Sequence, residues 1–240
     1  MSDPAAGDRD VVILSDLHLG PGRDPEGGRW SRLEDFFYDR ELASFLDHVR
    51  SRATREERPV RLVLNGDVFD FLLVTETPDP REAGEVGLSP SRAERKFGLR
   101  PSEQASIWKL ERIVEGHAEI FDALARLLAA GGELVLLPGN HDPELFYPGV
   151  QRALTDELLA RAGGEEPTAD PGDLARHVRF EPWFWYEPGR LFVEHGHQYD
   201  ESSVLSNLLY PLEPGRPRGA PPQIDLPVSS LFVRYLHNTL

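Results

Sequence analysis

The sequence predicts an α/β fold in which strands and helices alternate along the chain. Four short apolar runs are each followed directly by small and polar residues, and helical patterns separate the runs. Short, continuous apolar runs are typical of strands that are buried on both faces. Alternating strands and helices indicate βαβ units, in which ligands collect at the carboxyl ends of the strands.

Each predicted strand ends in a polar cluster. The apolar runs are Val11–Leu14, Val60–Leu64, Glu133–Leu137 and Leu191–Val193. The clusters that follow them are Ser15–His18, Asn65–Asp67, Pro138–Asp142 and Glu194–His197. All four clusters therefore fall at the edge of the sheet where a ligand is expected.

Two helices are predicted between these strands. Ser31–Glu34 has the form of a capping box, and apolar residues continue at helical spacing to Val49, with Phe36–Tyr38 expected in the core. A longer helix is predicted from about Ala105 to Ala130, and Gly131-Gly132 are expected to end it. His117 falls on its apolar stripe, and we expect a packed, hydrogen-bonded core histidine there rather than a substrate contact.

The remaining segments indicate loops and one short helix. Thr75–Pro101 and Gly163–Gly172 are rich in Pro, Gly and Glu; the first follows a ligand strand, so it is either a surface insertion or a lid that shapes the substrate entrance. Trp183–Tyr186 predicts a strand with alternating burial. Ser229–Leu236 begins an amphipathic helix. We expect one domain over residues 1–240, with a core at 11–200, an insertion or lid at 75–101 and an incomplete C-terminal segment at 201–240.

Composition limits the function further. The chain has 240 residues and no cysteine, so any metal must bind to nitrogen and oxygen ligands. A net charge of −15 argues against nucleic acid as a partner. No apolar run is long enough to span a membrane, and the polar N-terminus does not resemble a signal peptide, so a cytoplasmic location and at most peripheral membrane contact are expected. The oligomeric state is left open.

Taken singly, the polar clusters have structural interpretations as helix caps or turns. Together they place Asp, His and Asn side chains at the ends of four strands, and these donors suit Mn²⁺, Fe, Zn²⁺ or Mg²⁺. Two such cations, about 3.5–4 Å apart, can clamp a phosphoryl group and lower the pKa of a bridging water. The combination therefore predicts a metal-dependent hydrolase that needs no Ser or Cys nucleophile.

The motifs also resemble those of a known family. Asp16-Leu17-His18, Gly66-Asp67-Val68-Phe69-Asp70 and Gly139-Asn140-His141-Asp142 are similar, in order, to the first three signatures of the calcineurin-like metallophosphoesterases. Glu194-His195-Gly196-His197 is similar to the fourth. The resemblance implies a four-layer α/β/β/α sandwich of two mixed sheets. Within the family, the sequence around Asp67 is most similar to that of UDP-2,3-diacylglucosamine hydrolases of lipid A synthesis.

The resemblance also implies a role for each residue. Asp16 and His18 would bind a first metal ion, Asp67 would bridge both ions, and Asn140 and His195 would bind the second. His197 is a further candidate metal ligand, weighed evenly against a loop hydrogen-bond donor. His141 would be the general acid or transition-state stabiliser, oriented by Asp142, and Asp70 would hold a loop or ligand in place. The implied cofactor is two divalent cations, with Mn²⁺ preferred over Fe, Zn²⁺ or Mg²⁺.

One family feature is missing. A Gly-His-x-His signature ends the family pattern, and none follows Asp200 in this chain. A truncated chain is one interpretation, and reduced or abolished activity would follow from it. Three functions stay open: a general metallophosphoesterase acting on a phosphorylated small molecule, nucleotide or lipid; a UDP-2,3-diacylglucosamine pyrophosphatase-like enzyme; and a non-catalytic domain with an incomplete metal site.

Overall fold

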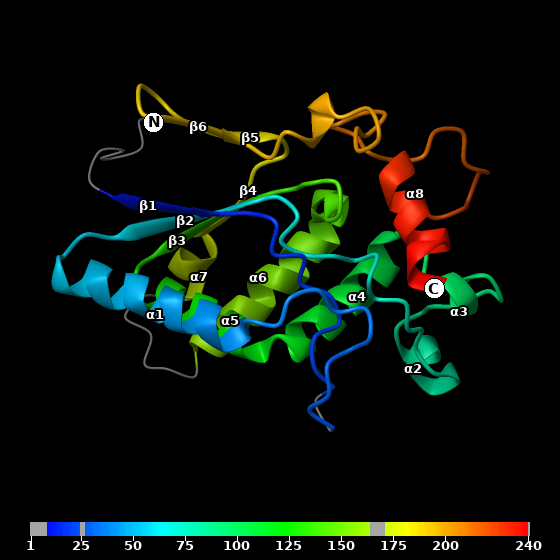
Figure 1. The fold of residues 1–240 in the computed structure, drawn as a ribbon, viewed down its shortest axis with the longest axis horizontal. Helices are drawn as coiled ribbons and strands as arrows, with labels where there is room; N and C mark the ends of the chain where they lie inside the picture. The colour runs from blue at the N-terminus through cyan, green and yellow to red at the C-terminus, as the bar shows by residue number, and fades with distance from the viewer. Residues whose placement is uncertain (1–8, 25–26, 164–170, 240) are drawn as a thin grey trace.

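The computed structural model describes residues 9–24, 27–163 and 171–239, and these form an α/β fold of stacked layers (Figure 1). The central layer is a parallel sheet with the strand order β1-β2-β3-β4. Its strands are β1 (Asp10–Leu14), β2 (Val60–Asn65), β3 (Glu133–Leu137) and β4 (Val178–Phe180). Leu14 pairs with Leu64, and Leu64 with Leu136, so the first three strands end at the same edge.

Helices cover one face of this sheet, and a second sheet covers the other (Figure 1). The large helices are α1 (Asp39–Arg55), α4 (Glu103–Gly116), α5 (Ala118–Ala129) and α6 (Pro148–Ala162). The second sheet is antiparallel and consists of β5 (Phe184–Glu187) and β6 (Leu191–Glu194). The predicted α/β fold of two packed sheets is confirmed. The sheets are not mixed as expected, since the first is parallel throughout and the second is antiparallel, and the large helices lie outside the parallel sheet.

Alternate residues of the parallel strands face the two neighbouring layers. Leu62 and Leu134 belong to the large core beneath the sheet, which includes residues of α1, α5 and α6. Val63 and Val135 instead pack with Trp185 of the second sheet. Because strands buried in this way need apolar residues at every position, they produce the continuous runs seen in the sequence. The expected alternation is also present in β5, where Trp185 is buried and Phe184 and Tyr186 are exposed.

The helix predicted from the capping box at Ser31–Glu34 begins later, at Asp39. Glu34 does not cap a helix; its buried carboxylate accepts hydrogen bonds from the backbone N–H groups of Gly22 and Phe36, at 2.5 and 2.9 Å. The expectation that Phe36–Tyr38 lie in the core is wrong for two of the three residues, since Phe37 is 45% and Tyr38 63% exposed.

The single helix predicted from Ala105 to Ala130 is two helices, α4 and α5, which meet at His117. The expectation for His117 itself is confirmed. Its ring is fully buried, and Nδ1 lies 2.9 Å from Asp39 Oδ1. Nε2 lies 3.2 Å from Glu34 Oε2, in an ion-pair rather than a hydrogen-bond geometry. The break in the helix therefore places an imidazole between two carboxylates.

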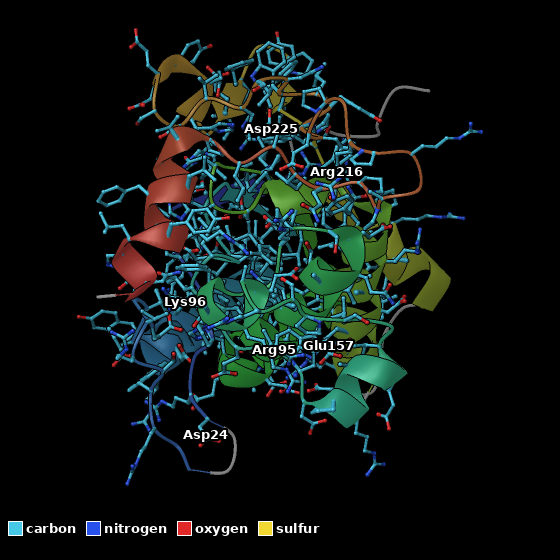
Figure 2. The ribbon with its side chains drawn as sticks, turned by 90° about the vertical axis from the view of Figure 1, so that its right-hand side faces the viewer. Asp24, Arg95, Lys96, Glu157, Arg216 and Asp225 are labelled. Carbon is cyan, nitrogen blue, oxygen red and sulfur yellow. The ribbon has the colours of Figure 1, made fainter. Side chains whose placement is uncertain are left out.

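The remaining segments contain short helices. The predicted insertion at 75–101 carries α2 (Pro80–Glu85) and α3 (Glu94–Phe97), and the basic side chains of Arg95 and Lys96 are exposed there (Figure 2). The chain also forms α7 (Pro171–Ala175), the predicted C-terminal helix α8 (Val228–Tyr235) and three 3₁₀ turns, η1 (Pro143–Phe146), η2 (His197–Tyr199) and η3 (His237–Thr239). Most of the predicted loop at 163–172 lies outside the described residues. No described helix combines the length and apolarity needed to cross a bilayer.

Candidate metal centre

The loops that follow β1, β2 and β3 are tied to one another by backbone hydrogen bonds. Asp16 N–H donates to the carbonyl of Gly66 at 3.1 Å, and His18 N–H donates to the carbonyl of Asp67 at 2.9 Å. His141 N–H donates to Asp67 Oδ1 at 2.8 Å. These bonds bring the first three polar clusters of the sequence to one edge of the sheet, as predicted.

Three candidate ligands have an unusual backbone conformation. Asp16, His18 and Asp67 have φ angles of 54°, 50° and 51°, in the left-handed region. Such angles are uncommon for residues other than glycine, and they cluster at functional sites where the surrounding structure holds them. Backbone hydrogen bonds from Asp16 to Gly66 and from His18 to Asp67 join the loops that carry these residues.

One group of potential metal ligands consists of Asp16, Asp67 and His195, which offer ligand atoms that all lie within 4.8 Å of one another. His195 Nε2 lies 3.4 Å from Asp67 Oδ2. The other ring nitrogen, Nδ1, donates to the carbonyl of Asn65 at 2.9 Å, since a carbonyl can only accept. The hydrogen bond fixes the ring so that Nε2 faces the carboxylates, which is a common arrangement for metal-binding histidines.

A second group consists of His18, Asp70 and His141, again with ligand atoms within 4.8 Å of one another. Asp70 Oδ2 lies 2.7 Å from His141 Nδ1 and 3.3 Å from His18 Nδ1. One buried carboxylate therefore orients two imidazoles through their Nδ1 atoms. His18 Nε2 is left facing Asp67 Oδ2, at 3.8 Å.

Charges within the centre shift the pKa values of its groups. Burial alone lowers the pKa of His141, but the carboxylates of Asp70 and Asp67 outweigh burial and raise it to about 9. For His195, Asp67 likewise outweighs burial and raises the pKa to about 9. Burial raises the pKa of Asp70, but the two imidazoles beside it lower the value to about 2. Because a histidine must lose a proton to bind a cation, metal binding through His195 is expected to weaken as the pH falls.

Asp142 does not orient His141, contrary to expectation, because Asp70 occupies that place. The carboxylate of Asp142 is fully buried and accepts hydrogen bonds from four backbone N–H groups, those of Asp67, Val68, Phe69 and Gly139. Burial and the neighbouring Asp67 carboxylate raise the pKa of Asp142 to about 6, whereas these N–H groups favour its ionised form. Asp142 therefore joins the loops after β2 and β3 and fixes the backbone of Asp67.

The last two predicted ligands are Asn140 and His197. Asn140 is mostly buried, between Gly139 and His141, whose N–H groups bond to Asp142 and Asp67. His197 is also buried, and the centre of its ring lies 5.5 Å from that of His195. Neither ring nitrogen of His197 has a hydrogen-bond partner in the described part of the chain, and burial lowers its pKa to about 4. His197 joins neither group of ligands, so its role as a ligand stays a prediction.

Replacing Gly139 by Ala is expected to weaken metal binding at least about tenfold, the size of effect that disturbing the support of a metal ligand produces. An added Cβ would lie 2.1 Å from Asp67 Oδ1, so the carboxylate must move. Titration with Mn²⁺ in a calorimeter measures the affinity. The control is Gly84→Ala in α2, where a Cβ meets nothing within 4 Å. Equal affinities in the two variants would contradict the arrangement around Asp67.

The fold and this centre define an α/β protein whose carboxylate and imidazole donors gather at the carboxyl edge of a parallel sheet. The family model of the calcineurin-like phosphoesterases matches residues 10–224, and the chain belongs to this family. Members of the family generally hydrolyse phosphoesters at a site that holds two divalent metal ions, and the donor groups described above are chemically suited to such ions. Searches of curated proteins and of solved structures give no match.

Proposed function

We propose that this protein hydrolyses a phosphate mono-, di- or pyrophosphoester with a water molecule activated by two divalent cations. The observation that carries the proposal is the position of Asp67 Oδ2, which lies 3.8 Å from His18 Nε2 and 3.4 Å from His195 Nε2. These histidines belong to different ligand groups. A carboxylate between two sets of donors is the arrangement that a ligand shared by two cations requires.

When bound, the cations supply Lewis-acid polarisation and a water of lowered pKa. Following the family pattern, we assign Asp16 and His18 to one cation, Asn140 and His195 to the other, and Asp67 to both; His197 is a further candidate. In the metal-free chain the ligand atom of Asp16 lies with those of Asp67 and His195, so this assignment requires Asp16 to turn towards His18 when metal binds. We propose Mn²⁺ as the ion; oxygen and imidazole nitrogen donors also suit Fe, Zn²⁺ or Mg²⁺.

His141 is the proposed general acid or transition-state stabiliser. Its Nδ1 is anchored on Asp70 at 2.7 Å, so Nε2 remains available to a substrate. In the metal-free protein, the carboxylates of Asp70 and Asp67 raise the pKa of His141 to about 9, so the ring is protonated at neutral pH. It can therefore donate a hydrogen bond or a proton to an oxygen of the phosphoryl group or of the leaving group. We propose a phosphorylated small molecule, nucleotide or lipid as the substrate, hydrolysed in the cytoplasm.

Removing metal ions with a chelator is expected to abolish phosphodiesterase activity, and adding Mn²⁺ should restore it. Elemental analysis of the active protein should find about two divalent ions per chain. Hydrolysis of bis-p-nitrophenyl phosphate provides the readout. Undiminished hydrolysis by metal-free protein would overturn the proposal, while a content of one ion or none, with no activity, would favour a non-catalytic domain.

A lipid-linked substrate is the second candidate, and an apolar cavity favours it. The cavity, of about 230 Å³, adjoins the loop that carries Asn140 and His141; Pro138, Pro143, Leu205 and Leu209 are among its lining residues. An acyl chain could occupy such a surface while the phosphate lies at the metal centre. Comparing hydrolysis of UDP-2,3-diacylglucosamine with that of bis-p-nitrophenyl phosphate tests this: a clear preference for the lipid supports the lipid A role, and no preference rejects it.

A further inference from the structure

In the C-terminal helix α8 and the turn η3, three polar residues are buried and several large apolar residues are exposed. Ser230, Arg234 and Asn238 recur at four-residue spacing and are only 0, 4 and 7% exposed. On the outer side, Phe232 is 59% and Tyr235 48% exposed. A helix that only contributed to the core would show the reverse pattern. The buried polar groups therefore need an explanation in terms of what they contact.

Each of the three buried side chains donates to the backbone of a different part of the domain. Ser230 Oγ donates to the carbonyl of Asn140 at 3.3 Å. Asn238 Nδ2 donates to the carbonyl of Leu72 at 2.8 Å. Arg234 donates to the carbonyls of residues 98 and 99, in the segment that leads to α4. Two of these contacts reach loops of the metal centre, and the third fixes α8 beside α3 and α4 (Figure 1).

The contact with Leu72 acts on the loop that carries Asp70. The N–H of Leu72 donates to Asp70 Oδ1 at 3.0 Å, while its carbonyl accepts from Asn238. The preceding carbonyl, that of Phe71, accepts from the buried amine of Lys109 at 2.7 Å. Two consecutive carbonyls are thus held by side chains from α4 and η3. Because Asp70 in turn orients His18 and His141, displacement of this loop would also displace both imidazoles.

We propose that Ser230 and Asn238 are positioning residues of the metal centre, which hold the loops of Asn140 and Asp70 respectively. This inference rests on the proposed function, because it assigns Asn140 to a metal ion. Outer groups that orient metal ligands typically change metal affinity 10- to 100-fold when they are removed. Replacing Ser230 should therefore weaken binding of the cation assigned to Asn140 and His195. Replacing Asn238 should weaken binding of the cation assigned to His18, because Asp70 orients that histidine.

Adjacent serines provide a matched pair of variants. Ser230→Ala removes the hydroxyl that contacts Asn140, whereas Ser229→Ala removes a hydroxyl that has no hydrogen-bond partner among the described residues. Mn²⁺ titration, followed by calorimetry or by electron paramagnetic resonance, should show about a tenfold loss of affinity at one of two sites in Ser230→Ala. Ser229→Ala should bind as the wild type does. Thermal unfolding of the metal-free proteins shows whether each variant is folded.

Asn238→Ala is the second variant, and we expect it to lose about tenfold in Mn²⁺ affinity at the site assigned to His18. If this variant does not fold, the serine pair still decides the question for Asn140. Two Mn²⁺ sites of unchanged affinity in folded Ser230→Ala and Asn238→Ala would overturn the positioning roles and leave the proposed function intact. A wild-type protein that binds no Mn²⁺ would instead overturn the proposed function.

Discussion

Replacing Asp67 by Asn is expected to reduce phosphoester hydrolysis by about 10³-fold or more. Loss of the shared carboxylate weakens both metal sites, and metal ions contribute several kcal/mol to transition-state stabilisation, each 1.36 kcal/mol being a factor of ten. Asn is the informative replacement, because it tolerates the left-handed φ of 51° at this position and keeps an acceptor for the N–H of His141. Steady-state hydrolysis and Mn²⁺ titration measure the two effects.

The control for Asp67→Asn is the same change at Asp156, an exposed residue of α6. Asp156→Asn should retain wild-type activity, and both variants should show wild-type circular dichroism. Full activity and normal metal content in folded Asp67→Asn would falsify the two-metal assignment.

Replacing His117 by Gln is expected to lower the free energy of unfolding by about 3–5 kcal/mol at pH 6.5, the usual cost of removing one partner of a buried ion pair. The His117 ring lies between Glu34 and Asp39, and the change leaves both carboxylates without their cation. Glu34 also holds the N–H groups of Gly20 and Gly22, so the loop after His18 should loosen as well. Urea denaturation of the metal-free protein measures the loss.

The pH dependence of this loss follows from the pKa of His117. Burial lowers that pKa, but the hydrogen bond with Asp39 and the negative charges of Asp39 and Glu34 outweigh burial and raise it from 6.5 to about 9. A raised pKa in the folded state gives stability that is fully present below pH 6.5 and is lost as the pH rises through about 9. The difference between wild type and His117→Gln should therefore shrink over this range.

The quantity to follow with pH is the difference in the free energy of unfolding between wild type and His117→Gln. The stability of either protein alone also depends on Lys109, whose contribution rises with pH. Burial lowers the pKa of Lys109 to about 7, so this group adds stability as the pH rises from 7 towards its unfolded value of about 10.4. A matched control is His48→Gln, which changes an exposed histidine of α1 and should unfold at the same urea concentration as the wild type at pH 6.5. A His117→Gln variant as stable as wild type at pH 6.5 would show that the buried ion pair contributes nothing.

The parts of the fold that depend on local patterns were predictable from the sequence. The runs at Val11–Leu14, Val60–Leu64 and Glu133–Leu137 became neighbouring parallel strands. The two central strands are buried on both faces, which leaves a continuous apolar signal, whereas Val11–Leu14 form the edge strand β1 and are only partly buried. The meeting of Asp16 and Asp67 followed from that topology, but the strand before His195, expected in the same sheet, is β6 of the second, antiparallel sheet, and β4 is the fourth parallel strand instead. Parallel strands bring their carboxyl ends to one edge whatever the spacing of the ligands along the chain.

The features that were missed depend on contacts between distant residues. Ser31–Glu34 has a capping-box pattern, but Glu34 gains more partners from the backbone of the preceding loop and from His117 than a helix start would offer. Asp70 holds its loop as expected and also orients His141, the role expected of Asp142, because four backbone N–H groups converge on Asp142. Periodicity gives no information on such convergence, since it reports burial and not hydrogen-bond partners.

The candidate ligands lie far apart in the chain, from Asp16 to His195, and this separation has a consequence for how the protein resists unfolding. No short peptide of the chain contains a complete set of these donors. Cations therefore bind tightly only to the folded protein and stabilise it as a whole, rather than a locally folded fragment. Saturating Mn²⁺ at 100 times its dissociation constant adds about 2.7 kcal/mol per site to the free energy of global unfolding. The metal supply of the cell would then set how long the protein survives proteolysis, separately from how fast it turns over substrate.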